Sequence, residues 1–316
     1  MEESVREITF FSEADGSMQP ALFCPAQGDG PRPLVVALHT WSYGMAGGGE
    51  KFFPGCAKRN WHCIYPEFRG PNWRPEACGS DLVVSDLAGA VAYVKANYPV
   101  DDSRVFLVGG SGGGHASLLL AGRHPELWTA AAAWCPISDI AKWHDSCLKV
   151  ERDKAYSEHI RLACGGDPSK DAAAYGEAMK RSPVTYLAAA RGRTIIDIGT
   201  GIHDGHTGSV PVSQSIEAFN LLAAGPDRIG EADIEYMVRR EAVPEHLRFD
   251  GEDPAYGEHR VLMRRVSGMV RLTIFEGGHD ILPGASLGFC DHQRRGAAPV
   301  WDSGAVSEGV GGELSR

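Results

Sequence analysis

Ser111 is the residue whose surroundings in the sequence point most directly to chemistry. It is the central residue of the pattern G-x-S-x-G, which begins at Gly109 and follows the apolar run Val105–Val108. A serine in a tight turn between a strand and a helix exposes its hydroxyl above the sheet, and the next backbone N–H points at the substrate. The pattern therefore predicts nucleophilic attack by Ser111, with the N–H of Gly112 stabilising the oxyanion. A glycine-rich turn without chemistry is one alternative. A dinucleotide-binding loop is the other, but the last glycine of the pattern G-x-G-x-x-G is missing here.

A nucleophilic serine needs a base, and twelve histidines are available. His279 lies in the segment E-G-G-H-D, just after the last expected core strand, and we expect it to be the base. His39 also ends an expected strand, but it precedes the serine in the chain. His115 falls on the expected helix behind Ser111, where its ring would point away from the hydroxyl.

The base needs an acidic partner that orients its ring, and Asp204 is the first candidate. It lies in a loop after the expected strand Thr194–Ile198. Asp197 is the alternative, but it falls inside that strand, where its carboxylate would be directed at the packed face of the sheet. His203 and His206 flank Asp204 and could indicate a metal site. Because no third ligand follows at zinc-like spacing, we expect neither a metal nor another cofactor.

These candidates fall on loops within an alternating pattern of strands and helices. Two short segments near the N-terminus, Val5–Phe11 and Met18–Cys24, predict an antiparallel hairpin. Beyond them, apolar runs typical of strands buried on both faces alternate with helical segments. The expected core strands are 34–38, 61–65, 104–108, 128–134, 194–198 and 269–275, and the clearest helices are 81–98 and 216–224. This order predicts one α/β domain over residues 1–316, with a mostly parallel sheet and functional loops at the carboxyl ends of its strands.

Two stretches interrupt the alternation. Residues 137–186 are helical in character and follow an expected strand, so they predict a helical cap over the site. Trp143, His144 and Tyr156 are the cap residues we expect to face the substrate, and packing of the cap onto the core is the alternative for each of them. Residues 226–267 are highly charged and predict a surface insertion. The glycine-rich tail, residues 284–316, has little pattern, and we expect part of it to be disordered.

The chain order Ser111, Asp204, His279 is that of α/β-hydrolases. Over about residues 30–283 the sequence resembles the prolyl oligopeptidase-like and esterase branch of that superfamily, in the motifs L-H-T-W, E-F-R-G, G-G-S-G-G-G-H, V-P-V-S-Q-S and G-G-H. The resemblance implies an α/β-hydrolase fold, with the helical cap added to it, and a serine hydrolase that works through an acyl-enzyme. Many members carry glycine where this chain has Thr40, and Trp41 can supply only its backbone N–H to the oxyanion.

Two further residues are candidates for substrate binding. Arg69 follows an expected strand end and could clamp a carboxylate or a sugar oxygen, although an ion pair that fixes its loop is the alternative. Trp134 ends another expected strand, and its aromatic face could bind a sugar ring, although a position in the core is the alternative. We also expect Trp143 of the cap to contact the substrate.

The composition restricts the kind of partner. With 31 Lys and Arg against 41 Asp and Glu, the formal charge is −10, which is unfavourable for a nucleic-acid partner. No apolar run is long enough to span a bilayer, and the first residues lack the pattern of a signal peptide, so we expect a cytoplasmic protein without a membrane partner. The eight cysteines form no C-x-x-C pair, which predicts reduced, buried thiols.

The sequence as a whole predicts a serine hydrolase that cleaves carboxylic esters, with a small ester or an acylated carbohydrate as its partner and no cofactor. A hydrolase of small peptides is the first alternative. A non-catalytic binding protein on a hydrolase scaffold is the second. The sequence leaves open whether the chain forms a homo-oligomer.

Overall fold

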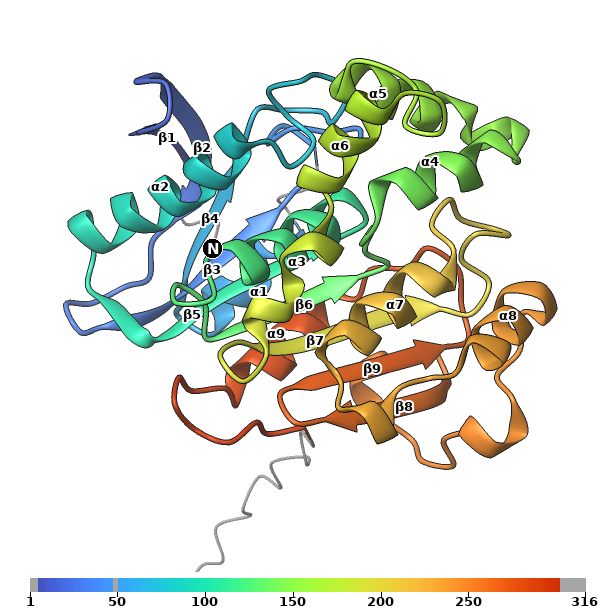
Figure 1. The fold of residues 1–316 in the computed structure, drawn as a ribbon. Helices are drawn as coiled ribbons and strands as arrows, with labels where there is room; N and C mark the ends of the chain where they lie inside the picture. The colour runs from blue at the N-terminus through green and yellow to red at the C-terminus, as the bar shows by residue number, and fades with distance from the viewer. Residues whose placement is uncertain (1–4, 48–50, 302–316) are drawn as a thin grey trace, which may run out of the picture.

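One mixed sheet forms the centre of the molecule (Figure 1). The structure, a computed structural model, describes residues 5–47 and 51–301. In this part of the chain nine strands lie in the order β1-β2-β4-β3-β5-β6-β7-β9-β8. Their bounds are β1 Arg6–Phe11, β2 Met18–Cys24, β3 Arg32–Leu38, β4 His62–Pro66, β5 Val100–Gly110, β6 Ala130–Trp134, β7 Ile195–Gly201, β8 Val261–Ser267 and β9 Val270–Phe275.

The six strands from β4 to β9 across the middle of the sheet run parallel, and β2 and β8 pair antiparallel with its outer members. The hairpin of β1 and β2 lies at one edge, as the sequence predicts. The mostly parallel sheet flanked by helices confirms the predicted fold class. Because the central strands are parallel, the loops after β3, β5, β6, β7 and β9 all emerge at the same edge.

The helices cover both faces of the sheet. Their bounds are α1 Phe53–Lys58, α2 Asp81–Asn97, α3 Gly112–Arg123, α4 Ile140–Leu148, α5 Lys154–Cys164, α6 Ala172–Lys180, α7 Val212–Leu222, α8 Glu231–Arg240 and α9 Pro283–Asp291. In β3, Leu34 and Val36 pack in the core with α2, α3 and α7, whereas Val35 and Ala37 pack with α1 and α9. Successive residues of a strand point to opposite faces, so a continuous apolar run supplies two cores at once.

The segment 137–186 leaves the sheet at the carboxyl end of β6 and contains α4, α5 and α6 (Figure 1). These helices pack on one another through a separate apolar cluster that also includes Trp41 of the loop after β3 and Val210 of the loop after β7. The cap, as we call residues 137–186 from here on, is therefore attached to loops at the carboxyl edge of the sheet.

One expectation needs correction. Residues 226–267 do not form a surface insertion throughout, because their last seven residues are β8, an edge strand that pairs with β9. At the start of the glycine-rich tail, residues 284–291 belong to α9, whose Leu287 and Phe289 are buried. Residues 302–316 of that tail lie outside the described residues. All eight cysteines are buried thiols, as predicted. None of the described helices is long and apolar enough to span a membrane.

Candidate active site

Ser111 stands at the turn between β5 and α3 in a backbone conformation that is unusual for a serine. Its φ of 56° and ψ of −121° lie outside the regions that L-residues prefer. The turn is fixed on both sides, because Ser111 N–H donates to Trp134 O at 2.8 Å and its carbonyl accepts from His115 N at 2.9 Å. Strain of this kind at a polar residue is characteristic of functional sites.

The glycines of the motif allow the backbone to approach this turn closely. A Cβ on Gly109 would lie 2.5 Å from the carbonyl oxygen of Gly113, so the strand and the helix can meet only without side chains there. A Cβ on Gly112 would lie 2.5 Å from the amide nitrogen of Trp41. The amide of Trp41 and the start of α3 are therefore neighbours beside Ser111, where the two expected oxyanion donors need to be.

The Trp41 amide is oriented by its own loop. His39 Nδ1 lies 2.9 Å from Thr40 O, and His39 Nε2 lies 2.8 Å from Glu67 O. Thr40 O belongs to the same planar peptide as the N–H of Trp41, so a contact that fixes one end also fixes the other. Burial lowers the pKa of His39, which stacks on Phe68 with 3.6 Å between ring centroids. His39 thus supports the loop and is not the base.

His279 and Asp204 are joined directly. His279 Nδ1 lies 2.7 Å from Asp204 Oδ2, across 75 residues of sequence. Asp204 is buried, and its second oxygen accepts from the backbone N–H groups of Gly205 at 3.0 Å and Val210 at 3.1 Å. The carboxylate therefore has one oxygen fixed by the backbone and the other on the imidazole, which is the arrangement that orients a catalytic histidine.

Electrostatics favour a protonated His279. Burial alone would lower its pKa, but the hydrogen bond and charge of Asp204, together with the charges of Asp280 and Asp153, outweigh burial and raise the pKa above its ordinary value. A proton taken up by this ring is therefore stabilised by nearby carboxylates.

The loop that carries His279 packs directly on the turn that carries Ser111. A Cβ on Gly110, the residue before Ser111, would lie 2.3 Å from the side chain of Ile281. No hydrogen bond joins Ser111 to His279 in the part of the chain that the structure describes. A bond between nucleophile and base is often long until the substrate binds. Ser111, His279 and Asp204 thus share one site, with the acid–base bond formed.

Cys135, which the sequence did not single out, lies among these residues. It follows Trp134 with a φ of 44°, and its Sγ lies 3.5 Å from Asp280 O. Burial, followed by the charge of Asp204, raises the pKa of its thiol. The possible metal-ligand atoms of Cys135, Asp204 and His279 lie within 4.8 Å of one another, but two of the three residues are already bonded to each other in the acid–base pair.

Asp197, the alternative acid, and the other candidate histidines His115 and His203 have other partners. Asp197 forms a two-bond ion pair with Arg271 of β9 at 2.8 and 2.7 Å, and both side chains are buried. His115 lies on α3 with Nε2 2.7 Å from Arg181 O, and burial lowers its pKa to about 4. His203 bridges two carboxylates, Glu241 at 2.8 Å and Glu276 at 2.6 Å.

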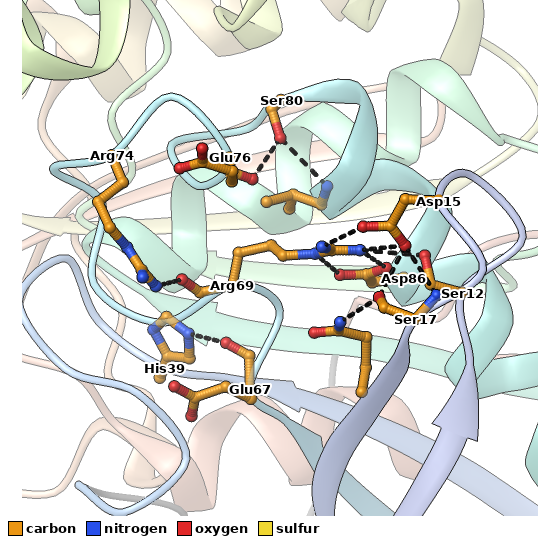
Figure 2. A network of polar contacts seen from close by, with 12 residues as sticks. Ser12, Asp15, Ser17, His39, Glu67, Arg69, Arg74, Glu76, Ser80 and Asp86 are labelled. Carbon is orange, nitrogen blue, oxygen red and sulfur yellow. Dashed lines mark hydrogen bonds and ion pairs between the residues drawn. The ribbon is translucent and has the colours of Figure 1, made fainter.

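Arg69 is part of an ion-pair network and not of the site around Ser111 (Figure 2). Its guanidinium donates two bonds to the buried Asp86 of α2, at 2.5 and 2.9 Å, and two to Asp15 of the β1–β2 turn, at 2.7 and 3.2 Å. The hydrogen bonds to Asp86 and Asp15 raise the pKa of the guanidinium. Arg69 thus forms ion pairs that fix its loop, which was the alternative to substrate binding. We therefore do not include Arg69 in the proposed substrate site.

Trp134 also has the alternative role, a position in the core. It is 1% exposed, and its Nε1 donates to Ser286 Oγ of α9 at 2.7 Å. Its ring packs in a cluster with Tyr256 and Phe275, so it does not face a substrate. We leave Trp134 out of the proposed substrate site as well.

Trp143 and Tyr156 attach the cap to the loops of the site. Trp143 packs edge-on against Trp41 with 4.7 Å between ring centroids, and its Nε1 donates to Ser209 O at 2.8 Å. Tyr156 is half-buried, and its hydroxyl interacts with the side chains of Ser209 and Ser42. Ser209 lies on the loop of Asp204 and Ser42 on the loop of Trp41, so Tyr156 spans the space between them. His144, the third expected cap residue, is fully buried.

Comparison with known proteins gives a family match. The family model described as "Prolyl oligopeptidase family" matches residues 68–255, which include Ser111 and Asp204. Feruloyl esterase B of Thermothelomyces thermophilus is 25% identical over 150 residues, which cover 43% of this chain and 50% of the esterase. Acylamino-acid-releasing enzyme of Sus scrofa is 28% identical over 147 residues, which cover 45% of this chain and 18% of that enzyme. The chain thus spans half of the first of these relatives and less than a fifth of the second.

Solved structures share the fold. An acylaminoacyl peptidase of Pyrococcus horikoshii superposes with a TM-score of 0.63 at 15% identity, over 94% of this chain and 43% of that one. A puromycin-hydrolysing peptidase of Mycobacterium tuberculosis superposes with a TM-score of 0.59 at 17% identity, over 91% of this chain and 40% of that one. With the family match, these similarities confirm the α/β-hydrolase fold that the motifs predict.

Proposed function

Because the chain belongs to the prolyl oligopeptidase family, we propose that it is a serine hydrolase that cleaves carboxylic esters through an acyl-enzyme. The observation that carries this proposal is the 2.7 Å contact between His279 Nδ1 and Asp204 Oδ2 beside the strained turn at Ser111. Nucleophile, base and orienting acid then come from the loops after β5, β9 and β7, which meet at one edge of the sheet.

In this mechanism His279 takes the proton of Ser111 as the hydroxyl attacks the ester carbonyl. Asp204 keeps the proton of the ring on Nδ1, so Nε2 is free to act as base, and its charge stabilises the imidazolium. The backbone N–H groups of Trp41 and Gly112 receive the negative charge that develops on the carbonyl oxygen, and each donor contributes about 3 kcal/mol. His279 then protonates the leaving alcohol, and water hydrolyses the acyl-enzyme by the same steps.

A small ester or an acylated carbohydrate is the substrate class we propose, and a small-peptide hydrolase is the second candidate. The similarity to a feruloyl esterase favours the first, and the similarity to acylamino-acid-releasing enzymes favours the second. A non-catalytic binding protein is the remaining alternative, and the formed acid–base pair argues against it because binding alone does not require it.

A panel of short-chain acyl esters, acetylated sugars and aminoacyl amides tests the proposal. We expect kcat/KM to be highest for an ester, because an alcohol leaves from the tetrahedral intermediate more easily than an amine. Higher values for the amides would favour the peptidase. Ser111→Ala should lower kcat by several orders of magnitude, and retention of more than a few per cent of the activity would remove Ser111 from the mechanism.

A further inference from the structure

Asp153 of the cap has a buried carboxylate with few polar partners. It ends the short 3₁₀ turn Glu151–Asp153 between α4 and α5, and its side chain is 8% exposed. Asp153 forms an ion pair with Arg152, whose Nε lies 3.7 Å from Oδ1 of Asp153. This distance is too long for a hydrogen bond. Within residues 5–47 and 51–301, no hydrogen bond reaches the carboxylate of Asp153.

Asp153 lies beside the acid–base pair. Its neighbour Arg152 donates to the carbonyl oxygens of His206 and Gly208, on the loop that carries Asp204. Gly208 touches the pair closely, since a Cβ there would lie 2.2 Å from Asp204 Oδ1 and 2.6 Å from His279 Cβ. The charges of Asp204 and His279 act on Asp153, and that of Asp153 acts in turn on His279.

Tyr156, one helical turn further on, completes the surroundings of this carboxylate. Asp153 is the N-cap of α5 and Tyr156 lies three residues further on, a spacing that brings helical side chains to the same face. Burial, followed by the charge of Asp153, raises the pKa of Tyr156. The ring of Tyr156 packs against Trp143 with 5.3 Å between centroids. The cap thus presents a carboxylate beside the loop of Asp204 and a half-buried aromatic ring between the loops of Trp41 and Asp204.

A buried carboxylate without hydrogen bonds is costly unless a donor reaches it. Burial raises the pKa of Asp153, because burial destabilises the charged form of a carboxyl group relative to its neutral form. Arg152 relieves only part of it, since its guanidinium is half exposed and its Nη2 is bonded to backbone carbonyls. An ammonium group offers the missing donors and a full positive charge, and an adjacent aromatic face attracts the same cation.

We propose that Asp153, with Tyr156 beside it, binds an ammonium group of the substrate close to the scissile carbonyl. The inference rests on the proposed hydrolase function and narrows its substrates to esters or amides that carry a cation. The ammonium belongs either to the acyl part, as the free amine of an aminoacyl group, or to the alcohol, as in an amino alcohol ester. The net charge of −10 draws both kinds of cation toward the molecule.

Two matched pairs of substrates test the inference and separate the sources. Alanine methyl ester and N-acetylalanine methyl ester differ by the charge on the acyl part. At neutral pH, protonated 2-(dimethylamino)ethyl acetate carries an N–H donor and a positive charge on the alcohol, and 3-methylbutyl acetate is its neutral counterpart of the same shape. We expect Asp153→Asn to lower kcat/KM for the charged member of one pair by about 10- to 100-fold, the range for the loss of a charged hydrogen bond. The neutral members should change by less than about threefold, the spread expected of a substitution without such a role.

Glu151→Gln is the matched control, because it removes the same charge from the same turn at a side chain that is 85% exposed. It should leave both members of each pair unchanged. Thermal unfolding of both variants verifies that they fold. The comparison is made at a pH above the midpoint of the His279 titration in both variants, where the effect of Asp153 on His279 does not alter the rate. An equal loss for charged and neutral members there would overturn the inference.

Failure of the hydrolase proposal gives a different result. In that case the wild-type protein hydrolyses none of the four esters and a fluorophosphonate does not label Ser111. Calorimetric binding of alaninamide and of trimethylammonium to Ser111→Ala, with and without Asp153→Asn, then tests the ammonium site alone. We expect at least tenfold weaker binding of one of the two cations when Asp153 is replaced, and equal binding of both would overturn the inference.

Discussion

The two buried aspartates of β7 and its loop have the same charge but different tasks. Asp204 accepts a hydrogen bond from Nδ1 of His279, whereas Asp197 accepts two hydrogen bonds from Arg271 in the core. We expect Asp204→Asn to lower kcat by about 10⁴-fold with little change in stability, because the amide favours the wrong tautomer of the ring. Asp197→Asn should instead cost about 3–5 kcal/mol in the free energy of unfolding, since it leaves Arg271 buried without its partner.

Steady-state kinetics and urea unfolding of the two variants separate these tasks. Each variant serves as the control of the other, since the substitution is the same and both side chains are buried. A loss of stability in Asp204→Asn combined with a loss of kcat in Asp197→Asn would reverse the assignment of the acid.

The ionisation of His279 sets the pH dependence of the proposed reaction. His279 must be neutral to accept a proton, and its pKa is raised above the ordinary value of 6.5. For a neutral ester, kcat/KM should therefore fall as the pH decreases, with a midpoint above 6.5. Asp153→Asn should move this midpoint to lower pH, because the charge of Asp153 is one of those that hold the proton on the ring. An unchanged midpoint in this variant would show that the two groups are not coupled.

The sequence predicted the residues that local patterns define and missed those that distant contacts define. Ser111, Asp204 and His279 each follow an apolar run, so their loops could be placed at one edge of the sheet. Asp153 and Cys135 reach the same site through the packing of the cap and through a turn with positive φ. A single sequence carries no signal for either kind of contact.

Among the elements, the cap is the part of the molecule that shapes the pocket in this account. Trp143→Phe keeps an aromatic ring but removes the bond from Nε1 to Ser209 O and opens space beside Trp41. We expect kcat/KM for bulky acyl esters to rise relative to acetyl esters, measured with one alcohol and a series of acyl chains.

Trp128→Phe is the matched control for this prediction. Trp128 is also buried, and its Nε1 also donates to a backbone carbonyl, that of Leu120 at 3.1 Å, but it lies in the main core. It should lower stability without altering the preference for acyl chain length. An equal change of preference in both variants would show that the cap does not select the acyl group.

The strands of the central sheet were predictable because each is a continuous apolar run, and β8 was not. Its sequence V-L-M-R-R-V-S alternates buried and partly exposed positions and includes Arg264 and Arg265, so it resembles the charged segment that precedes it. Arg264 is accommodated by an ion pair with Asp253 at 2.8 Å and by the faces of Phe249 and Tyr256. An edge strand tolerates such residues since one of its sides is open to solvent.

At the scale of the whole molecule, His203 joins the two loops that form the acid–base pair. It precedes Asp204, and it contacts Glu276 of the His279 loop and Glu241 at the end of α8. The hydrogen bonds to Glu276 and Glu241 raise the pKa of His203. A raised pKa in the folded state contributes stability that is fully present below the unfolded pKa, ordinarily 6.5, and that is lost as the pH rises through the folded pKa.

We therefore expect His203→Asn to lower the melting temperature more at pH 6 than at pH 9, measured by thermal unfolding in the same salt concentration. His292→Asn, at an exposed histidine, is the control and should show no such dependence. If the difference in melting temperature between wild type and His203→Asn did not change with pH, the charge of His203 would contribute nothing to stability.

The central claim, that Ser111 is an activated nucleophile, is tested most directly by reaction with a fluorophosphonate followed by mass mapping. The account predicts one adduct for each folded chain, located on Ser111, with no adduct in folded Ser111→Ala or in the unfolded wild-type protein. A folded wild-type protein that gains no adduct, or gains it on another residue, would contradict the account.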